Sequence, residues 1–160
     1  MSFSKLANFI ADFFSNMIFL SCITSWFLSQ LIKAIAALLH IRRRGFREVI
    51  EALLWRTGGM PSSHTAVVTS MTASLAFNEG YGSNLFAVSL FVAMVVIRDA
   101  MGVRRAVGLQ ARTFNLLGKQ AAEKLGIEFH PVKEIQGHAP LEVIAGGILG
   151  IFISAAFAWL

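Results

Sequence analysis

Two histidines stand in settings that suit phosphoryl transfer. His138 is followed four residues later by Glu142, and side chains spaced i and i+4 on a helix are neighbours. A carboxylate that binds one imidazole nitrogen fixes the tautomer and raises the basicity of the ring, as a histidine nucleophile or base requires. His64 lies in a different segment, where it could donate a proton to a leaving oxygen.

The seven residues that end at His64 have the pattern of a helix start. They are Gly-Gly-Met-Pro-Ser-Ser-His, residues 58–64. A proline followed by serines is typical of the first turn of a helix, where a serine oxygen caps free backbone N–H groups. Such a terminus binds phosphate through those N–H groups and the helix dipole. We therefore expect Ser62 and Ser63 to contact a phosphate.

Basic side chains that match phosphate oxygens lie in further segments. Arg98 and Arg105 are seven residues apart, on one helical face, and Arg104 is adjacent. Guanidinium groups bind phosphate oxygens in pairs. Asp99 would repel phosphate, so we expect it to orient an arginine or a histidine. Lys33 has two equal interpretations, a phosphate ligand or a side chain that extends to the headgroups, and the arginines alone could be a charge cluster at the membrane.

The composition is that of a membrane protein. Of the 160 residues, 56% are hydrophobic and 14% are charged, whereas soluble domains have about 45–50% and roughly 25%. The pI near 10.0 could indicate nucleic acid, but the basic residues flank apolar stretches, so attraction to anionic lipid explains them and no nucleic-acid partner is expected. No histidine–cysteine or paired-carboxylate set indicates a metal, and we expect neither metal nor cofactor.

The apolar stretches predict an all-α, polytopic membrane helical bundle, a single domain over residues 1–160, with about four spans. Apolar residues at helical spacing over 45–56 add an amphipathic helix in the membrane interface. The predicted spans are residues 14–41, 62–79, 84–112 and 139–160, and a polar cytoplasmic loop covers 116–137.

Lysine and arginine beside the spans predict the orientation. If the end of the first span at Arg42–Arg47 is cytoplasmic, nearly all basic residues fall on the cytoplasmic side. The histidine, lysine and arginine sites then share one membrane level, where charges usually face the interior of a bundle. We expect an integral protein of the bacterial inner (plasma) membrane with its active face in the cytoplasm. In the last span, Gly146 and Gly150 form a GxxxG spacing, which is a packing face or a homodimer face.

Three motifs resemble the divergent branch of the type 2 phosphatidic acid phosphatase family, which is related to acid phosphatases and vanadium haloperoxidases. They are Gly-Gly-Met-Pro-Ser-Ser-His (58–64), Asp-Ala-Met-Gly-Val-Arg-Arg-Ala-Val-Gly-Leu-Gln (99–110) and Gly-His-Ala-Pro (137–140). The resemblance implies that His64 is the acid of the second motif and that His138, with Glu142, is the nucleophile of the third. Lys33 and Arg56 are the candidates for the lysine and arginine of the first.

The resemblance implies a phosphatase acting on a membrane lipid phosphate or pyrophosphate, prenyl or glycerolipid, through a phosphohistidine. The family's third motif has an arginine six residues before its histidine, and this chain has Val132 there. Two alternatives therefore remain open. One is a non-catalytic phospholipid-binding or transport protein that keeps the phosphate pocket, and the other is a structural partner subunit that uses the GxxxG face.

Overall fold

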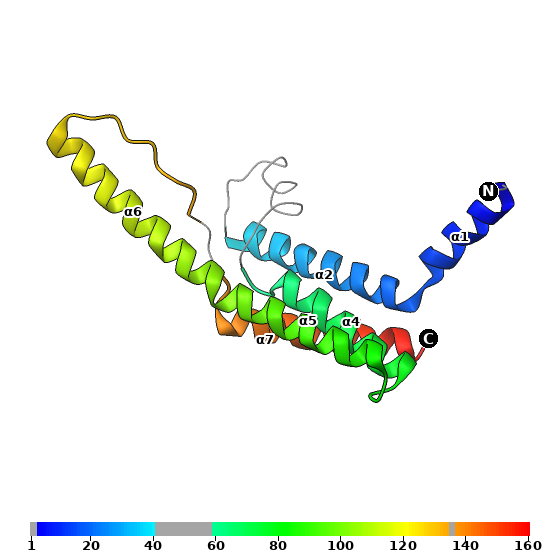
Figure 1. Ribbon diagram of the computed structural model, residues 1–160. Helices are drawn as coiled ribbons and strands as arrows, with labels where there is room; N and C mark the ends of the chain where they lie inside the picture. The colour runs from blue at the N-terminus through cyan, green and yellow to red at the C-terminus, as the bar shows by residue number, and fades with distance from the viewer. Residues whose placement is uncertain (1–2, 41–58, 135–136) are drawn as a thin grey trace.

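The structure is a computed structural model that describes residues 3–40, 59–134 and 137–160 (Figure 1). The predicted interfacial helix at 45–56 and the candidate Arg56 lie outside the described residues. Within the described ranges the regular structure is entirely helical, as predicted for the fold class. The helices are α1 (Phe3–Ser15), α2 (Met17–His40), α4 (Ser63–Glu79), α5 (Asn84–Met101), α6 (Val103–Leu125) and α7 (Pro140–Ala158).

Three helical stretches in the described residues are long and apolar enough to cross a membrane. They are Met17–Ala36, Asn84–Leu125 and Pro140–Ala158. The predicted second span corresponds to α4, which has 17 residues and is not among the three. The chain is thus a membrane helical bundle, and α4 contributes to it as an enclosed helix. The side of the membrane that the site faces stays a prediction.

Helix α4 lies at the centre of the bundle and contacts α2, α5 and α7. Its buried residues are small, namely Ser63, Thr65, Ala66, Ser70, Thr72, Ser74 and Ala76. Small side chains let helix backbones approach closely, and hydroxyls hydrogen-bond between helices. Two such bonds join Ser74 Oγ to Ser21 Oγ of α2 at 2.7 Å and Ser70 Oγ to Ser154 Oγ of α7 at 3.0 Å. These contacts hold the middle of α4 between α2 and α7, and the motif lies two turns earlier, at the start of α4.

The GxxxG glycines of α7 pack against α4 of the same chain. A Cβ atom added at Gly146 would meet the backbone oxygen of Ser62, and one at Gly150 would meet the backbone oxygen of Ala66. Of the two interpretations of this spacing, packing within the chain is the one seen here. A homodimer through these glycines would require α4 to move, and a homodimer through any surface stays a prediction.

The alanine substitution Gly150→Ala is expected to destabilise the bundle by about 1–3 kcal/mol, because the added methyl group must push the α4 backbone away. Gly147→Ala is the matched control, since its Cβ would lie 3.8 Å from the Cγ2 atoms of Thr65 and Thr69, an ordinary contact. Thermal unfolding in detergent measures both, and we expect a midpoint lower by roughly 5 °C for Gly150→Ala alone. Equal midpoints for the two variants would contradict this account of the helix contact.

The region predicted as a polar loop, residues 116–137, differs from the prediction. Helix α6 continues to Leu125 and ends at Gly126, which has φ +65°, a left-handed conformation that glycine adopts without strain. The chain then returns along α6, where Asn115 Nδ2 donates to Val132 O at 2.8 Å and Val132 N donates to Asn115 Oδ1 at 2.9 Å. The Phe129 ring packs on Gly118. Helix α6 therefore extends away from the bundle, and the segment that follows it, up to residue 134, runs back along the helix (Figure 1).

Candidate functional site

His138 is held in a defined orientation where α7 begins. Its Nδ1 lies 2.8 Å from Glu142 Oε2, and its side chain is 4% exposed. Glu142 Oε2 also accepts from the backbone N–H of Ala139 at 3.2 Å, and the backbone N–H of His138 donates to the carbonyl of Ala100 at 3.1 Å. The bond to a carboxylate favours a proton on Nδ1 and leaves the lone pair of Nε2 for chemistry.

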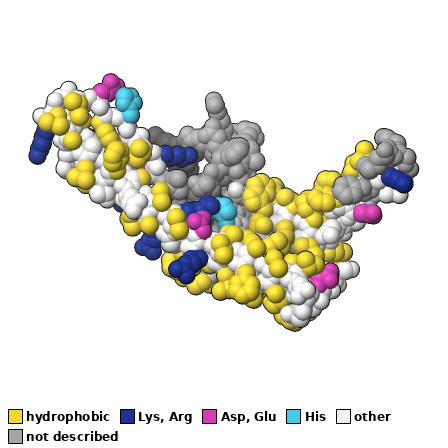
Figure 2. Space-filling view, in the orientation of Figure 1, with side chains coloured by type: hydrophobic (Ala, Val, Ile, Leu, Met, Phe, Trp, Pro, Cys, Tyr) yellow, Lys and Arg dark blue, Asp and Glu magenta, His cyan; other side chains and the backbone are white. Residues whose placement is uncertain are grey.

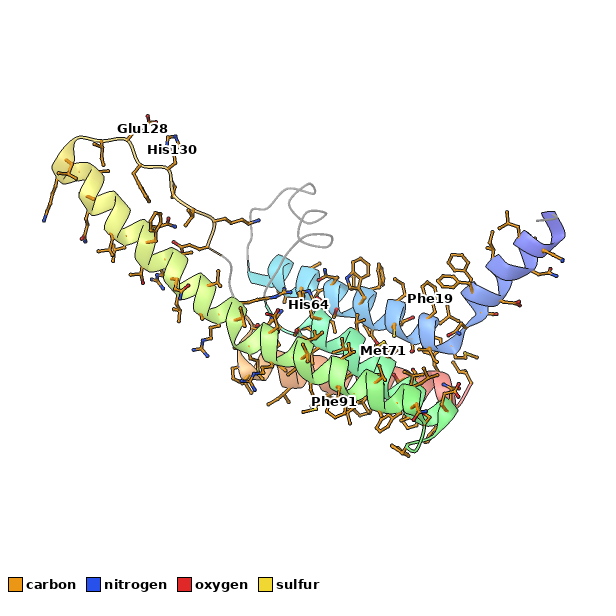
Figure 3. The ribbon with its side chains drawn as sticks, viewed as in Figure 1. Phe19, His64, Met71, Phe91, Glu128 and His130 are labelled. Atoms are coloured by element: carbon orange, nitrogen blue, oxygen red, sulfur yellow. The ribbon has the colours of Figure 1, made fainter. Side chains whose placement is uncertain are left out.

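His64 lies opposite, as the second residue of α4 (Figure 3). The centroids of the His64 and His138 rings are 6.1 Å apart, and the ring planes are inclined by 60°. A nucleophile about 3–3.5 Å from phosphorus and a proton donor about 2.6–3.2 Å from an oxygen span a distance of this order. His64 Nδ1 is buried and has no hydrogen-bond partner among the residues described. The two imidazoles can therefore contact opposite sides of one phosphate.

Lys33 brings the end of α2 to the start of α4. Its side chain is 4% exposed, and its Nζ donates to Ser63 Oγ and to Gln30 Oε1, each at 3.1 Å. A buried ammonium group is costly unless it is paired and hydrogen-bonded. Lys33 therefore lies inside the bundle beside the motif of residues 58–64. This position agrees with a role at the site and differs from a side chain that extends to the headgroups. Gln30 was not predicted as part of the site, although its i, i+3 spacing to Lys33 within an apolar span could have indicated it.

Ser62 serves the helix start. Its Oγ accepts from the Thr65 backbone N–H at 3.4 Å and from Thr65 Oγ1 at 3.1 Å, and its own N–H donates to the carbonyl of Glu142 at 2.8 Å. The serine is completely buried. It therefore joins the first turns of α4 and α7, which carry the two histidines. A phosphate contact from its hydroxyl stays a prediction, and Ser63 is the serine whose hydroxyl meets Lys33.

Arg104 is the arginine that acts on His64. Its charge and those of Lys33 and Asp99 lie close enough to affect the imidazole of His64 electrostatically. Arg104 Nε lies 2.8 Å from Asp99 Oδ2, and the two side chains are 41% and 42% exposed. Figure 2 shows basic, acidic and histidine side chains gathered on the visible face near the junction of α5 and α6, above a largely hydrophobic surface. Asp99 thus orients an arginine at the exposed edge of the site.

Arg98 and Arg105 are placed differently from Arg104. Arg98 follows the buried Ala93 by five residues, and at about 100° per residue this turns it about 140° from the side that faces the bundle. Both arginines are exposed. The structure therefore brings together six predicted positions, Lys33, Ser63, His64, Asp99, Arg104 and His138, with Glu142 behind His138. Arg98 lies outside this group, and the backbone of Arg105 packs against Gly137, next to His138, while its side chain is exposed.

The described residues contain no group of three histidine, cysteine, aspartate or glutamate side chains that could hold a metal ion. The polar groups that this site brings together are imidazole, ammonium, guanidinium and hydroxyl. Apart from the paired carboxylates of Glu142 and Asp99, these groups match an oxyanion in charge and hydrogen bonding.

Comparison with known proteins agrees with the motifs. The model of the Divergent PAP2 family matches residues 14–153, a range that includes every residue of the site. A protein of Bacillus subtilis (strain 168), the uncharacterized membrane protein YuiD, is 34% identical over 161 residues, covering 92% of this chain and 98% of that protein. No solved structure shows significant similarity to the chain. The chain is a membrane protein that belongs to the divergent PAP2 family.

Proposed function

We propose that this protein is a lipid phosphatase that removes phosphate from a membrane-embedded phosphomonoester or pyrophosphate through a phosphohistidine at His138. The observation that carries the proposal is the pair of imidazoles 6.1 Å apart, one of them bound at Nδ1 by a carboxylate. A histidine oriented in this way is suited to nucleophilic attack, and the family of the chain supports phosphatase chemistry.

The first step transfers the phosphoryl group to the protein. His138 Nε2 attacks phosphorus, the bond from phosphorus to the departing oxygen breaks, and His64 gives its proton to that oxygen, which is the ester oxygen of a phosphomonoester or the bridging oxygen of a pyrophosphate. In the second step water attacks the phosphohistidine, His64 takes the water proton, and inorganic phosphate leaves with both histidines restored. Lys33 and Arg104 contribute positive charge where the loose transition state spreads negative charge over three equatorial oxygens.

The position of the pocket supports a lipid substrate. His138 and Lys33 are both 4% exposed. Lys33 lies within a helix that has the length and apolarity of a membrane span, and His138 lies just before another. A substrate with an acyl or prenyl chain can place its phosphate at this level while the chain stays in the bilayer. Assays of phosphate release from a prenyl phosphate and from a glycerolipid phosphate will show which class of lipid is the substrate.

A second function, phospholipid binding or transport without turnover, is supported by one observation. The position six residues before His138 is Val132, and its backbone is held by Asn115 of α6. No arginine is supplied from that position. Arg104, which instead contributes a guanidinium, is paired with Asp99, so the pocket could bind the anion with less stabilisation of a transition state.

Phosphate release from detergent-solubilised protein separates the two functions. We expect release from phosphatidate or a prenyl diphosphate, inhibition by micromolar orthovanadate, which forms a trigonal-bipyramidal adduct like the transition state, and no effect of chelators. A water-soluble phosphomonoester such as glucose phosphate is the control for the lipid class and should be a poor substrate. Binding of vanadate without release of phosphate from any lipid would favour the binding function.

A further inference from the structure

A second candidate site lies on the side of α5 that faces away from the bundle. A groove of about 710 Å³ is lined there by Phe91, Met94, Val95, Met101 and Arg98, among others. These residues recur every three or four positions, so they share one face of the helix. The groove is shallow and open on its outer side, because all of its lining residues belong to one stretch of the chain, residues 91–102.

The charge of the groove lies at one end. Arg98 is in the last turn of α5, and it has no carboxylate partner in an ion pair among the described residues. An 18-residue helix is about 27 Å long, close to the roughly 30 Å of the hydrocarbon core. Arg98 therefore lies near one edge of the core, at the level of phospholipid phosphates, and Arg105 extends the exposed positive charge away from the core.

The apolar part of the groove runs from Arg98 towards the middle of the bilayer. Phe91 is seven residues before Arg98, which is about 10 Å along the helix. The side chains of Phe91, Met94 and Val95 are exposed on a helix that has the character of a membrane span, so lipid chains are the solvent that meets them. An arginine at headgroup level above an apolar groove complements an anionic headgroup with its acyl chain.

We propose that this groove binds one anionic phospholipid, with its phosphate on Arg98 and an acyl chain along Phe91, Met94 and Val95. The site is separate from the pocket of His64 and His138, because Arg98 is turned about 140° from the side of α5 that faces the bundle. The lipid bound here is a resident ligand of the protein and does not undergo reaction. The inference does not depend on phosphatase activity.

Native mass spectrometry of the detergent-solubilised full chain, titrated with phosphatidylglycerol or with phosphatidylcholine of the same acyl chains, tests the proposal. We expect the wild type to bind one phosphatidylglycerol roughly tenfold more tightly than phosphatidylcholine, as a charge-assisted hydrogen bond provides. Arg98→Gln should lose this preference. Arg112→Gln is the matched control, because it removes the same charge from another exposed position outside the groove, and it should keep the preference.

Filling the apolar part gives an independent measurement. Val95→Trp should weaken binding of both lipids at least fivefold, because the indole occupies the space of the acyl chain, and an exposed position tolerates the substitution. Equal affinity of the wild type for the two lipids would overturn the proposal. An equal loss of preference in Arg98→Gln and Arg112→Gln would do so too, because it would indicate diffuse attraction by the basic helix. Unchanged affinity in Val95→Trp would remove the groove as the binding surface.

Discussion

Replacement of His138 by glutamine is expected to reduce phosphate release from the lipid substrate by roughly 10⁴-fold or more, as loss of a covalent nucleophile does. Glutamine keeps a polar side chain that can still bind Glu142 Oε2, now 2.8 Å from Nδ1, but it offers no nitrogen lone pair for attack. The fold should be retained, so circular dichroism and the thermal midpoint should match the wild type. Initial rates with saturating lipid measure the effect.

His130→Gln is the matched control for this substitution. His130 also lies near a carboxylate, with Nε2 3.5 Å from Glu128 Oε1, but both side chains are 84% exposed, and they lie on the return segment beyond α6 (Figure 3). The rate of phosphate release by His130→Gln should equal that of the wild type. Acid-labile, histidine-linked phosphate should accumulate briefly in the wild type and be absent in His138→Gln. Robust hydrolysis by His138→Gln would exclude a phosphohistidine at this residue and would favour the binding or transport function.

The fold class and the enclosed position of α4 followed from local composition. The apolar stretches have the length of membrane helices, and the small residues of α4 indicate close packing on every side. The structure agrees, since α4 contacts α2, α5 and α7. Ser70 and Ser74 meet serines of two different helices, and that pairing depends on the rotation of each helix, which composition does not specify.

The length of helix α6 could not be predicted from the local sequence. Residues 116–125 are mixed in polarity, and the sequence alone predicts a loop there because no apolar span continues. Their helix is held by contacts from a later segment, with Phe129 on Gly118 and Val132 on Asn115. Gly126, with its positive φ, marks the end. A glycine after a run of good helix formers is the signal that could have placed this boundary.

The site divides in the same way. The contact of His138 with Glu142 was predicted from their spacing of four residues, but the geometry differs from that of a helical pair, because His138 lies just before the N-cap of α7 and only Glu142 is in the helix. The contact of Lys33 with Ser63 joins residues thirty positions apart, and a shared membrane level was enough to predict their proximity. Membrane level alone did not separate Arg104 from Arg98, because Arg98 lies on the outward side of α5 whereas Arg104 lies in the first turn of α6.

The substitution His64→Ala is expected to affect substrates according to their leaving group. For a lipid alkoxide, which needs a proton as it departs, loss of a general acid should reduce the rate by roughly 10²–10⁴-fold. For an aryl phosphate with a nitrophenolate leaving group, the oxygen departs as an anion and the loss should be below about tenfold. The His64 ring has the position for this role, 6.1 Å from His138 and with Nδ1 buried.

This asymmetry distinguishes an acid from a group that merely shapes the pocket. A structural histidine, once removed, would slow both substrates alike, and a protein that only binds anions gives no reason for any dependence on the leaving group. Ser63→Ala is the control, because it removes a partner of Lys33 in the same turn without removing a proton donor to the leaving oxygen, and it should slow the two substrates by equal factors. Equal losses for His64→Ala would remove His64 as the acid. In that case the imidazole of His64 would be a ligand for the equatorial oxygens of the phosphate, beside Lys33 and Arg104.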